Sequence, residues 1–180
     1  ITSYRFIGDR WANLDPLKRT PRPDVPQLDP VYYGLSDADL NTVFNAGSFK
    51  GTPDHATFGQ IYDALKATYC GSIGVEYMYL STVAEKRWIQ DRLERIHSKP
   101  TYTADERKRM LERLTAAETL ERYLHTRYVG QKRFSLEGGE STIVAMDELI
   151  RVAGAGGVDE IVIGMAHRGR LNVLVNTLGK

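Results

Sequence analysis

A strand–turn–helix pattern near the carboxyl end, over residues 161–178, most constrains how this chain can fold. The run Ile161–Ile163 is short, apolar and β-branched, which is typical of a fully buried strand. Apolar residues then recur at helical spacing, at Leu171, Leu174, Val175 and Leu178. Gly179 is typical of a helix end. A buried strand followed closely by a helix predicts an α/β fold, in which ligands bind at the carboxyl ends of the strands.

Four residues, His167–Arg170, separate the predicted strand from the predicted helix. A helix that begins at this point directs free backbone N–H groups toward the crevice, and these favour an anion. The guanidinium groups of Arg168 and Arg170 and the imidazole of His167 therefore indicate a site for an anionic ligand. The local pattern leaves one alternative open, which is a solvated turn whose arginines pair with surface carboxylates.

Three threonine-based capping boxes predict the starts of helices. In this motif the threonine side chain accepts a hydrogen bond from the backbone N–H three residues later. The Glu or Gln at that later position accepts, in return, from the backbone N–H of the threonine. The pairs are Thr57 with Gln60, Thr82 with Glu85, and Thr103 with Glu106. Apolar residues at helical spacing follow each pair and predict helices. The first is expected to stop by Cys70–Gly71, the second at Lys99–Pro100, and the third before Arg127.

Other segments have weaker but readable patterns. Five prolines between Pro16 and Pro30 predict an extended connector, because proline fixes φ and lacks a backbone donor. We expect helices over residues 3–14, from Ser36 through Phe44, and from Glu140 through Ile150, with an extended segment over residues 75–80.

The order of the predicted elements divides the chain into two regions. Residues 1–98, which include the proline-rich connector at 16–30, are expected to form an amino-terminal helical subdomain. Residues 99–180 end in helix–strand–helix and are expected to begin an α/β domain. A stable sheet needs more strands than this region supplies, so we expect the chain to be part of a longer protein.

The composition excludes several classes of protein. With 24 basic and 23 acidic side chains, the chain lacks the basic excess of a nucleic-acid-binding module. A single cysteine, Cys70, excludes an internal disulfide and fits a reducing compartment. No apolar run is long enough to span a bilayer, and no signal peptide is visible. His55, His97 and His125 have no metal-ligand spacing, so we predict no metal site.

Five motifs in order carry a resemblance to a known enzyme family. They are residues 165–174 (Met-Ala-His-Arg-Gly-Arg-Leu-Asn-Val-Leu), 132–140 (Lys-Arg-Phe-Ser-Leu-Glu-Gly-Gly-Glu), 85–90, 68–78 and 12–17. Together they resemble the amino-terminal part of the thiamine-dependent, decarboxylating first component of 2-oxoglutarate dehydrogenase. The resemblance covers nearly all of the 180 residues. One departure is Ile7–Asp9, where the family carries Arg-Gly-His, and we assign that position no role.

The resemblance implies an oxidoreductase of the citric acid cycle. Such an enzyme decarboxylates 2-oxoglutarate and transfers the succinyl unit to a lipoyl group, using thiamine diphosphate and magnesium. It implies a multienzyme complex with a lipoyl-bearing succinyltransferase and a dihydrolipoyl dehydrogenase, and a homodimeric first component. It also implies a thiamine-diphosphate-binding α/β domain with a mainly parallel sheet. The location would be the cytoplasm of a bacterium or the mitochondrial matrix of a eukaryote, without nucleic-acid or membrane partners.

The family's functional residues can be carried over at two positions. His167 matches the active-site histidine, which is expected to hydrogen-bond the substrate or to assist proton movement. Arg168 matches the arginine that contacts thiamine diphosphate and the substrate. Gly169 is expected to allow a tight backbone turn. Arg170 is expected either to contact the residues around the site from outside or to form a structural ion pair. Glu137 is read either as part of the wall behind the site or as a helix cap.

The magnesium signature of thiamine enzymes, Gly-Asp-Gly, is missing. Gly8 and Asp9 are followed by Arg10, so this match is by chance. The metal ligands are expected beyond Lys180, and residues 1–180 alone are expected to be inactive.

Two groups of alternatives remain open from the sequence. Within the enzyme class, the chain could belong to a relative that acts on 2-oxoadipate, or to a 2-oxoglutarate decarboxylase or carboligase. Outside it, the chain could be a non-catalytic helical interaction module. Such a module would use Lys132, Arg133, Arg168 and Arg170 as a basic patch for an anionic partner.

Overall fold

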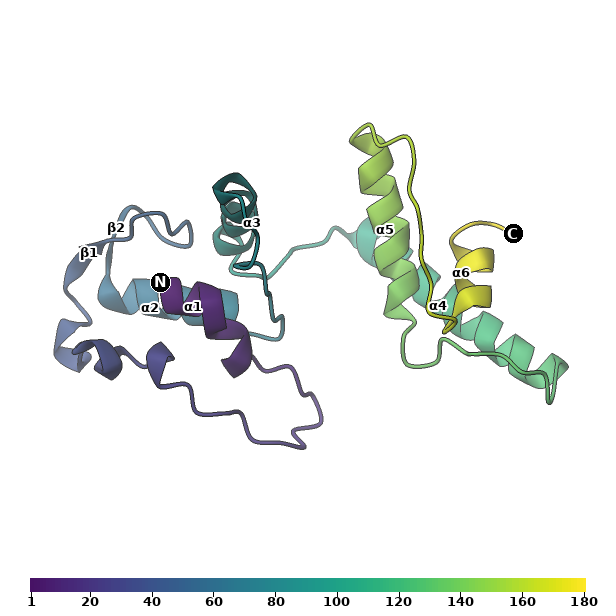
Figure 1. The fold of residues 1–180 in the computed structure, drawn as a ribbon, viewed down its shortest axis with the longest axis horizontal. Helices are drawn as coiled ribbons and strands as arrows, with labels where there is room; N and C mark the ends of the chain where they lie inside the picture. Colours follow the sequence, from purple (N-terminus) through teal and green to yellow (C-terminus); the bar gives the residue numbers. More distant parts are fainter. The chain divides into compact units, whose positions relative to one another are not determined.

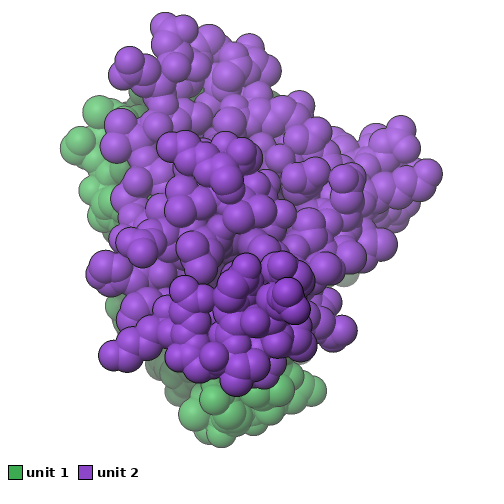
Figure 2. All heavy atoms as spheres, turned by 90° about the vertical axis from the view of Figure 1, so that its right-hand side faces the viewer, with its two compact units in different colours: residues 1–101 green, residues 102–180 purple.

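The computed structural model describes residues 1–180 and divides into two compact units, residues 1–101 and 102–180. Figure 1 shows the ribbon, and Figure 2 shows the first unit in green and the second in purple. About half of the residues are helical, and the only sheet has two short antiparallel strands. The identification of these regions as a helical subdomain and a thiamine-diphosphate-binding domain stays a prediction.

The first unit is built around one central helix. Its elements are α1 (Thr2–Ile7), the 3₁₀ turns η1 (Gly8–Trp11), η2 (Pro26–Leu28), η3 (Pro30–Tyr33) and η4 (Asp37–Asp39), strands β1 (Val43–Asn45) and β2 (His55–Thr57), and helices α2 (Phe58–Tyr69) and α3 (Val83–Arg95). Helix α2 contacts α1, α3 and β2. Its buried face contributes Ile61, Leu65 and Tyr69 to the core of this unit.

The predicted helix from Ser36 through Phe44 is wrong. The Asp39 carboxylate accepts from the Ser36 backbone N–H at 2.8 Å, and this local cap closes only the single turn η4. The carbonyl groups of Leu40 and Thr42 accept hydrogen bonds from the first residues of α2, so the chain leaves the helical path. Residues 43–45 then pair with 55–57 as β1 and β2, with Phe44 opposite Ala56.

Two other expectations in this unit differ from the structure. The helix expected over residues 3–14 is α1 followed by the 3₁₀ turn η1, and the following backbone at Ala12 is extended. The segment 75–80, expected to be extended, differs at residues 77–80, which form a turn in which the Leu80 N–H donates to the Tyr77 carbonyl at 3.1 Å. Both differences arise because these short segments follow the surrounding packing rather than their own propensity.

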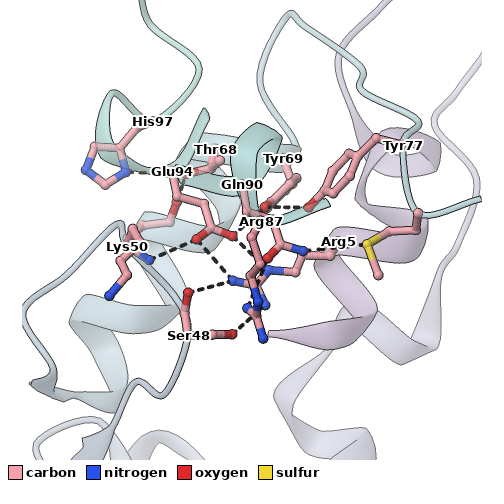
Figure 3. Close-up of polar contacts among 12 residues, drawn as sticks. Arg5, Ser48, Lys50, Thr68, Tyr69, Tyr77, Arg87, Gln90, Glu94 and His97 are labelled. Atoms are coloured by element: carbon pink, nitrogen blue, oxygen red, sulfur yellow. Dashed lines mark hydrogen bonds and ion pairs between the residues drawn. The ribbon is translucent and has the colours of Figure 1, made fainter. Parts of the chain in front are cut away.

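A buried carboxylate ties the elements of the first unit together (Figure 3). Glu94 on α3 is fully buried and accepts from Arg5 Nε at 2.8 Å and Arg5 Nη2 at 3.0 Å. It also accepts from the Tyr69 hydroxyl at 2.6 Å and from the Lys50 backbone N–H at 2.8 Å. Removing one partner of such a pair leaves an uncompensated buried charge, which is strongly destabilising. In the core of the same unit, burial raises the pKa of the Cys70 thiol to about 11.

The second unit consists of three helices around a small core. Helix α4 (Ala104–Arg127) contacts both α5 (Ser141–Ala155) and α6 (Arg170–Asn176). The core comprises Ala117, Leu136, Ile143 and Val173, with Met146 packed against it. The capping box predicted for Thr103 and Glu106 is present at the start of α4.

The predicted buried strand Ile161–Ile163 is wrong for these 180 residues. The segment lies outside any strand, and the side chain of Val162 is 95% exposed (Figure 1). A strand needs a neighbour to accept and donate its backbone hydrogen bonds, and residues 102–180 contain no other strand. The parallel sheet is therefore not observed.

None of the helices combines the length and the apolar character that crossing a membrane requires.

Candidate functional site

The residues between the predicted strand and α6 form a tight turn with an unusual backbone. His167 has φ of +77° and Gly169 has φ of +73°, both in the left-handed region. The Arg170 N–H donates to the His167 carbonyl at 3.3 Å, and the Gly169 N–H donates to the Phe134 carbonyl at 2.8 Å. A histidine in this conformation is uncommon and is strained, and such residues cluster at functional sites.

Gly169 cannot be replaced without strain, as the sequence predicts. A Cβ atom at this position would lie 2.4 Å from Leu136 Cδ1 and 3.1 Å from Leu136 Cβ. Leu136 is a core residue, so its side chain has little room to move. The glycine therefore allows the turn to lie directly on the core of the second unit.

The cationic side chains of the turn have no carboxylate partners. Arg168 Nη2 donates to the Glu137 carbonyl at 3.1 Å, and neither Arg168 nor Arg170 forms an ion pair. Of the two roles left open for Arg170, the ion pair is not formed within residues 1–180. His167 and Arg168 are both exposed, and the His167 ring lies 6.1 Å from the Phe134 ring, centroid to centroid. Two exposed guanidinium groups without carboxylates leave positive charge available to an anion.

The helix that follows the turn contributes less than the sequence suggests. Helix α6 has seven residues, and the Gly169 N–H at its start is already bonded to the Phe134 carbonyl. An anion at this turn would therefore be held by the two guanidinium groups rather than by the helix dipole. Glu137 does not cap α5, because the residue before that helix is Glu140.

The basic patch proposed for an interaction module is reduced in the structure. Arg133 donates from Nη1 to the Glu121 carboxylate, and its side chain is only 13% exposed. Its charge is therefore neutralised inside the unit. Of the four cations in that patch, Lys132, Arg168 and Arg170 remain without an ion pair.

Glu121 is the contributor to this site that the sequence analysis missed. It has no role in the sequence analysis, but its side chain is 3% exposed. Glu121 follows Ala117 by four residues, and Ala117 is fully buried in the core of this unit. That i, i+4 spacing places the carboxylate on the buried face of the helix, which indicates burial but not the partners of the carboxylate.

No group of three or more His, Cys, Asp or Glu side chains is arranged to hold a metal ion. The turn presents exposed arginine and histidine side chains on a glycine-dependent backbone, and an anionic ligand for it stays a prediction.

Comparison with known proteins identifies close relatives. No family model matches the chain. The chain is 62% identical over 180 residues to a 2-oxoglutarate dehydrogenase E1 component from Cupriavidus necator, covering all of this chain and 19% of that protein. It is 47% identical over 182 residues to the E1 component from Haemophilus influenzae, covering 20% of it. It is 46% identical over 180 residues to the E1 component from Azotobacter vinelandii, covering 19% of it.

The matches cover this chain completely, but the chain spans only about one fifth of the length of these relatives. Over its whole length, this chain is a close sequence relative of the amino-terminal fifth of 2-oxoglutarate dehydrogenase E1 components.

Proposed function

We propose that this chain is part of a thiamine-diphosphate-dependent 2-oxoglutarate dehydrogenase E1 component, which decarboxylates 2-oxoglutarate oxidatively and passes the succinyl unit to a lipoyl group. The observation that carries the proposal is the 62% identity over all 180 residues. The turn at residues 167–170 supports it independently, because it offers unpaired cations to a ligand that carries phosphate and carboxylate groups.

The residues of the turn fit thiamine diphosphate and a dicarboxylic oxo acid. Arg168 would hold the diphosphate and a substrate carboxylate, because its planar guanidinium presents paired donors to either group. His167 would hydrogen-bond the substrate or hold a proton during the reaction. When bound, thiamine diphosphate supplies the electron sink that decarboxylation of a 2-oxo acid requires. The share of these residues is to bind and orient.

The remaining parts of the site belong to the four fifths of the relatives that this chain does not span. We place the magnesium ligands there, since residues 1–180 hold no group suited to a metal ion. We also place there the parallel strands against which Ile161–Ile163 would pair, completing a thiamine-diphosphate-binding domain that begins near residue 99. Residues 1–180 alone are therefore proposed to be inactive.

The assembly follows from the same assignment. The complete subunit would be a homodimer and would act with a lipoyl-bearing succinyltransferase and a dihydrolipoyl dehydrogenase. It would work in the bacterial cytoplasm, or in the mitochondrial matrix if the source is eukaryotic, within the citric acid cycle.

Substitution of the turn residues in the complete E1 protein tests the proposal. We expect His167→Ala and Arg168→Ala each to lower kcat/KM for 2-oxoglutarate by roughly 10²- to 10⁴-fold, because each removes a positioned charged or proton-transferring group. Steady-state decarboxylation with an artificial electron acceptor measures the effect. Lys132→Ala is the matched control, since Lys132 is an exposed cation in the neighbouring loop without an ion pair.

The same assay separates the alternatives. Near-normal kinetics in both the His167 and the Arg168 variants would remove these residues from the site. A higher kcat/KM for 2-oxoadipate than for 2-oxoglutarate would instead assign the chain to the six-carbon relative. If the chain were a basic interaction module, Lys132→Ala would weaken binding of an anionic partner as much as Arg168→Ala, and neither would change turnover.

A further inference from the structure

The buried carboxylate of Glu121 contacts both segments that form the candidate site. Its Oε2 accepts from Arg133, and its Oε1 accepts from the Leu136 backbone N–H at 3.0 Å and from Asn172 Nδ2 at 3.0 Å. Asn172 is fully buried and also donates to the Ala117 carbonyl at 2.9 Å. These four residues, Glu121, Arg133, Leu136 and Asn172, are called the Glu121 network below.

The Glu121 network holds the segment against which the turn is built. Between Arg133 and Leu136, the Phe134 carbonyl accepts the Gly169 N–H at 2.8 Å. One residue beyond Leu136, the Glu137 carbonyl accepts Arg168 Nη2 at 3.1 Å. Both backbone groups that hold the turn are therefore adjacent to residues bonded to Glu121.

A second route reaches the turn through α6. Asn172 lies in the first turn of this helix, two residues after Arg170, and its side chain is bonded to Glu121. Asn176 Nδ2 donates to Asn172 Oδ1 at 2.7 Å, so both polar atoms of the Asn172 side chain are hydrogen-bonded. The start of α6 is thus anchored to the middle of α4 by the same carboxylate that anchors the 133–137 segment.

We propose that Glu121 is a positioning residue for the candidate site: through the Glu121 network it sets the orientation of Arg168 and His167 toward an anionic ligand. This inference rests on the proposed function of the turn and adds a residue that touches no ligand itself. Small displacements of a binding group are costly, since a shift of about 1 Å can reduce activity roughly 10²-fold.

The charge of Glu121, and not only its shape, is required by these contacts. The carboxylate accepts from three donors, and a glutamine of the same size has only one acceptor oxygen. Its amide nitrogen would face the Arg133 guanidinium, which also presents only donors. Glu121→Gln therefore keeps the volume of the side chain but breaks its bond to Arg133, leaving that guanidinium largely buried beside Glu137 Oε1 at 3.9 Å.

The test uses Glu121→Gln in the complete E1 protein, with Glu118→Gln as the matched control. Glu118 lies on the same helix, but its side chain is 54% exposed and pairs with Arg122 on the surface. Three quantities are measured: the Kd of thiamine diphosphate by calorimetry, the KM and kcat for 2-oxoglutarate, and the melting temperature. Arg133→Gln and the double variant complete a double-mutant cycle. The cycle reports whether Glu121 and Arg133 affect the site through the contact between them.

A positioning role predicts that Glu121→Gln raises the Kd of thiamine diphosphate, or the KM for 2-oxoglutarate, roughly 10- to 100-fold in protein that remains folded. Glu118→Gln should leave both constants within about twofold. The double variant should lose no more than the larger of the two single losses, because both substitutions break the same bond.

Two results would overturn the inference. One is unchanged Kd and KM in Glu121→Gln with only a lower melting temperature, which is the mark of a purely structural role. The other is full additivity in the cycle with Arg133. Failure of the proposed function would look different, since His167→Ala and Arg168→Ala would then also retain normal constants.

Discussion

At the scale of single residues, the turn at 167–170 combines strain with exposed charge. His167 at φ of +77° lies in the left-handed region, which costs a non-glycine residue about 1 kcal/mol or more. The bonds from Gly169 to Phe134 and from Arg168 to Glu137 hold the turn in place. The absence of any ion pair at Arg168 and Arg170 favours the anion site over the alternative of arginines paired at the surface.

Gly169→Ala tests the backbone requirement at this scale. The new Cβ would lie 2.4 Å from Leu136 Cδ1 at a φ of +73°, so we expect the turn to shift at a cost of about 1–3 kcal/mol. In the complete E1 protein, the affinity for thiamine diphosphate should then fall about tenfold or more.

The control for this substitution is Gly164→Ala. Gly164 precedes the same turn, and a Cβ there would meet no atom within 4 Å. Calorimetric titration with thiamine diphosphate compares the two variants. Equal, wild-type affinity in both would show that the left-handed glycine is unimportant to the site.

The candidate residues of the turn could be named from the sequence, while a buried contributor could not. His167, Arg168 and Gly169 share one motif at the start of a predicted helix, and their functional roles stay predictions. Glu121 could not be named from charge alone, because a glutamate in a long, charged helix is most often solvated. Its role depends on contacts with residues 133, 136 and 172, which no local pattern contains.

At the scale of elements, helices with capping boxes were predicted well and strands were not. Thr57 and Thr103 form complete boxes in the structure, and the Thr82 side chain accepts from the Glu85 N–H. A cap is a local contact, so its signal lies within four residues of sequence. The strands β1 and β2 have three residues each, too few for an alternating pattern, and exist only because they pair with each other.

Removing one helix cap measures how much that local contact contributes to the stability of the helix. Thr103→Ala removes the acceptor for the Glu106 N–H, which lies 3.2 Å from Thr103 Oγ1. We expect the start of α4 to lose about 1 kcal/mol of local stability, seen as several-fold faster amide hydrogen exchange in its first turn.

Thr119→Ala is the comparison for this cap. Thr119 is an exposed residue in the interior of α4, where alanine is the better helix former. In the Thr119→Ala variant, amide hydrogen exchange in the first turn of α4 should stay unchanged or become slower. Faster exchange of equal size in both variants would mean that the effect at Thr103 is not due to the cap.

At the scale of the whole molecule, each unit uses one buried glutamate to connect its segments. Glu94 joins α1, α2 and α3 in residues 1–101, and Glu121 joins α4, α6 and the 133–137 segment in residues 102–180. Each glutamate also pairs with an arginine, Arg5 or Arg133. Neither pair could be predicted, because the partners of the first lie 89 residues apart and those of the second contact across a loop.

The expected parallel sheet is not observed in residues 1–180. Ile161–Ile163 has the composition of a buried strand, yet Val162 is 95% exposed, because these residues have no strand beside them. The composition of a segment indicates whether it is suited to a strand. Whether the strand forms depends on a second strand elsewhere in the chain that pairs with it. Its suitability for a sheet agrees with the proposal that the relatives' remaining length supplies the neighbouring strands.

The central claim is that His167 and Arg168 face a diphosphate cofactor and an oxo acid. The most direct measurement is an experimental structure of the complete E1 protein with thiamine diphosphate, magnesium and 2-oxoglutarate bound. The account predicts that the Arg168 guanidinium lies about 3 Å from a diphosphate or carboxylate oxygen, with the His167 imidazole within hydrogen-bonding distance of the substrate. Both side chains directed away from the ligands, beyond contact distance, would contradict it.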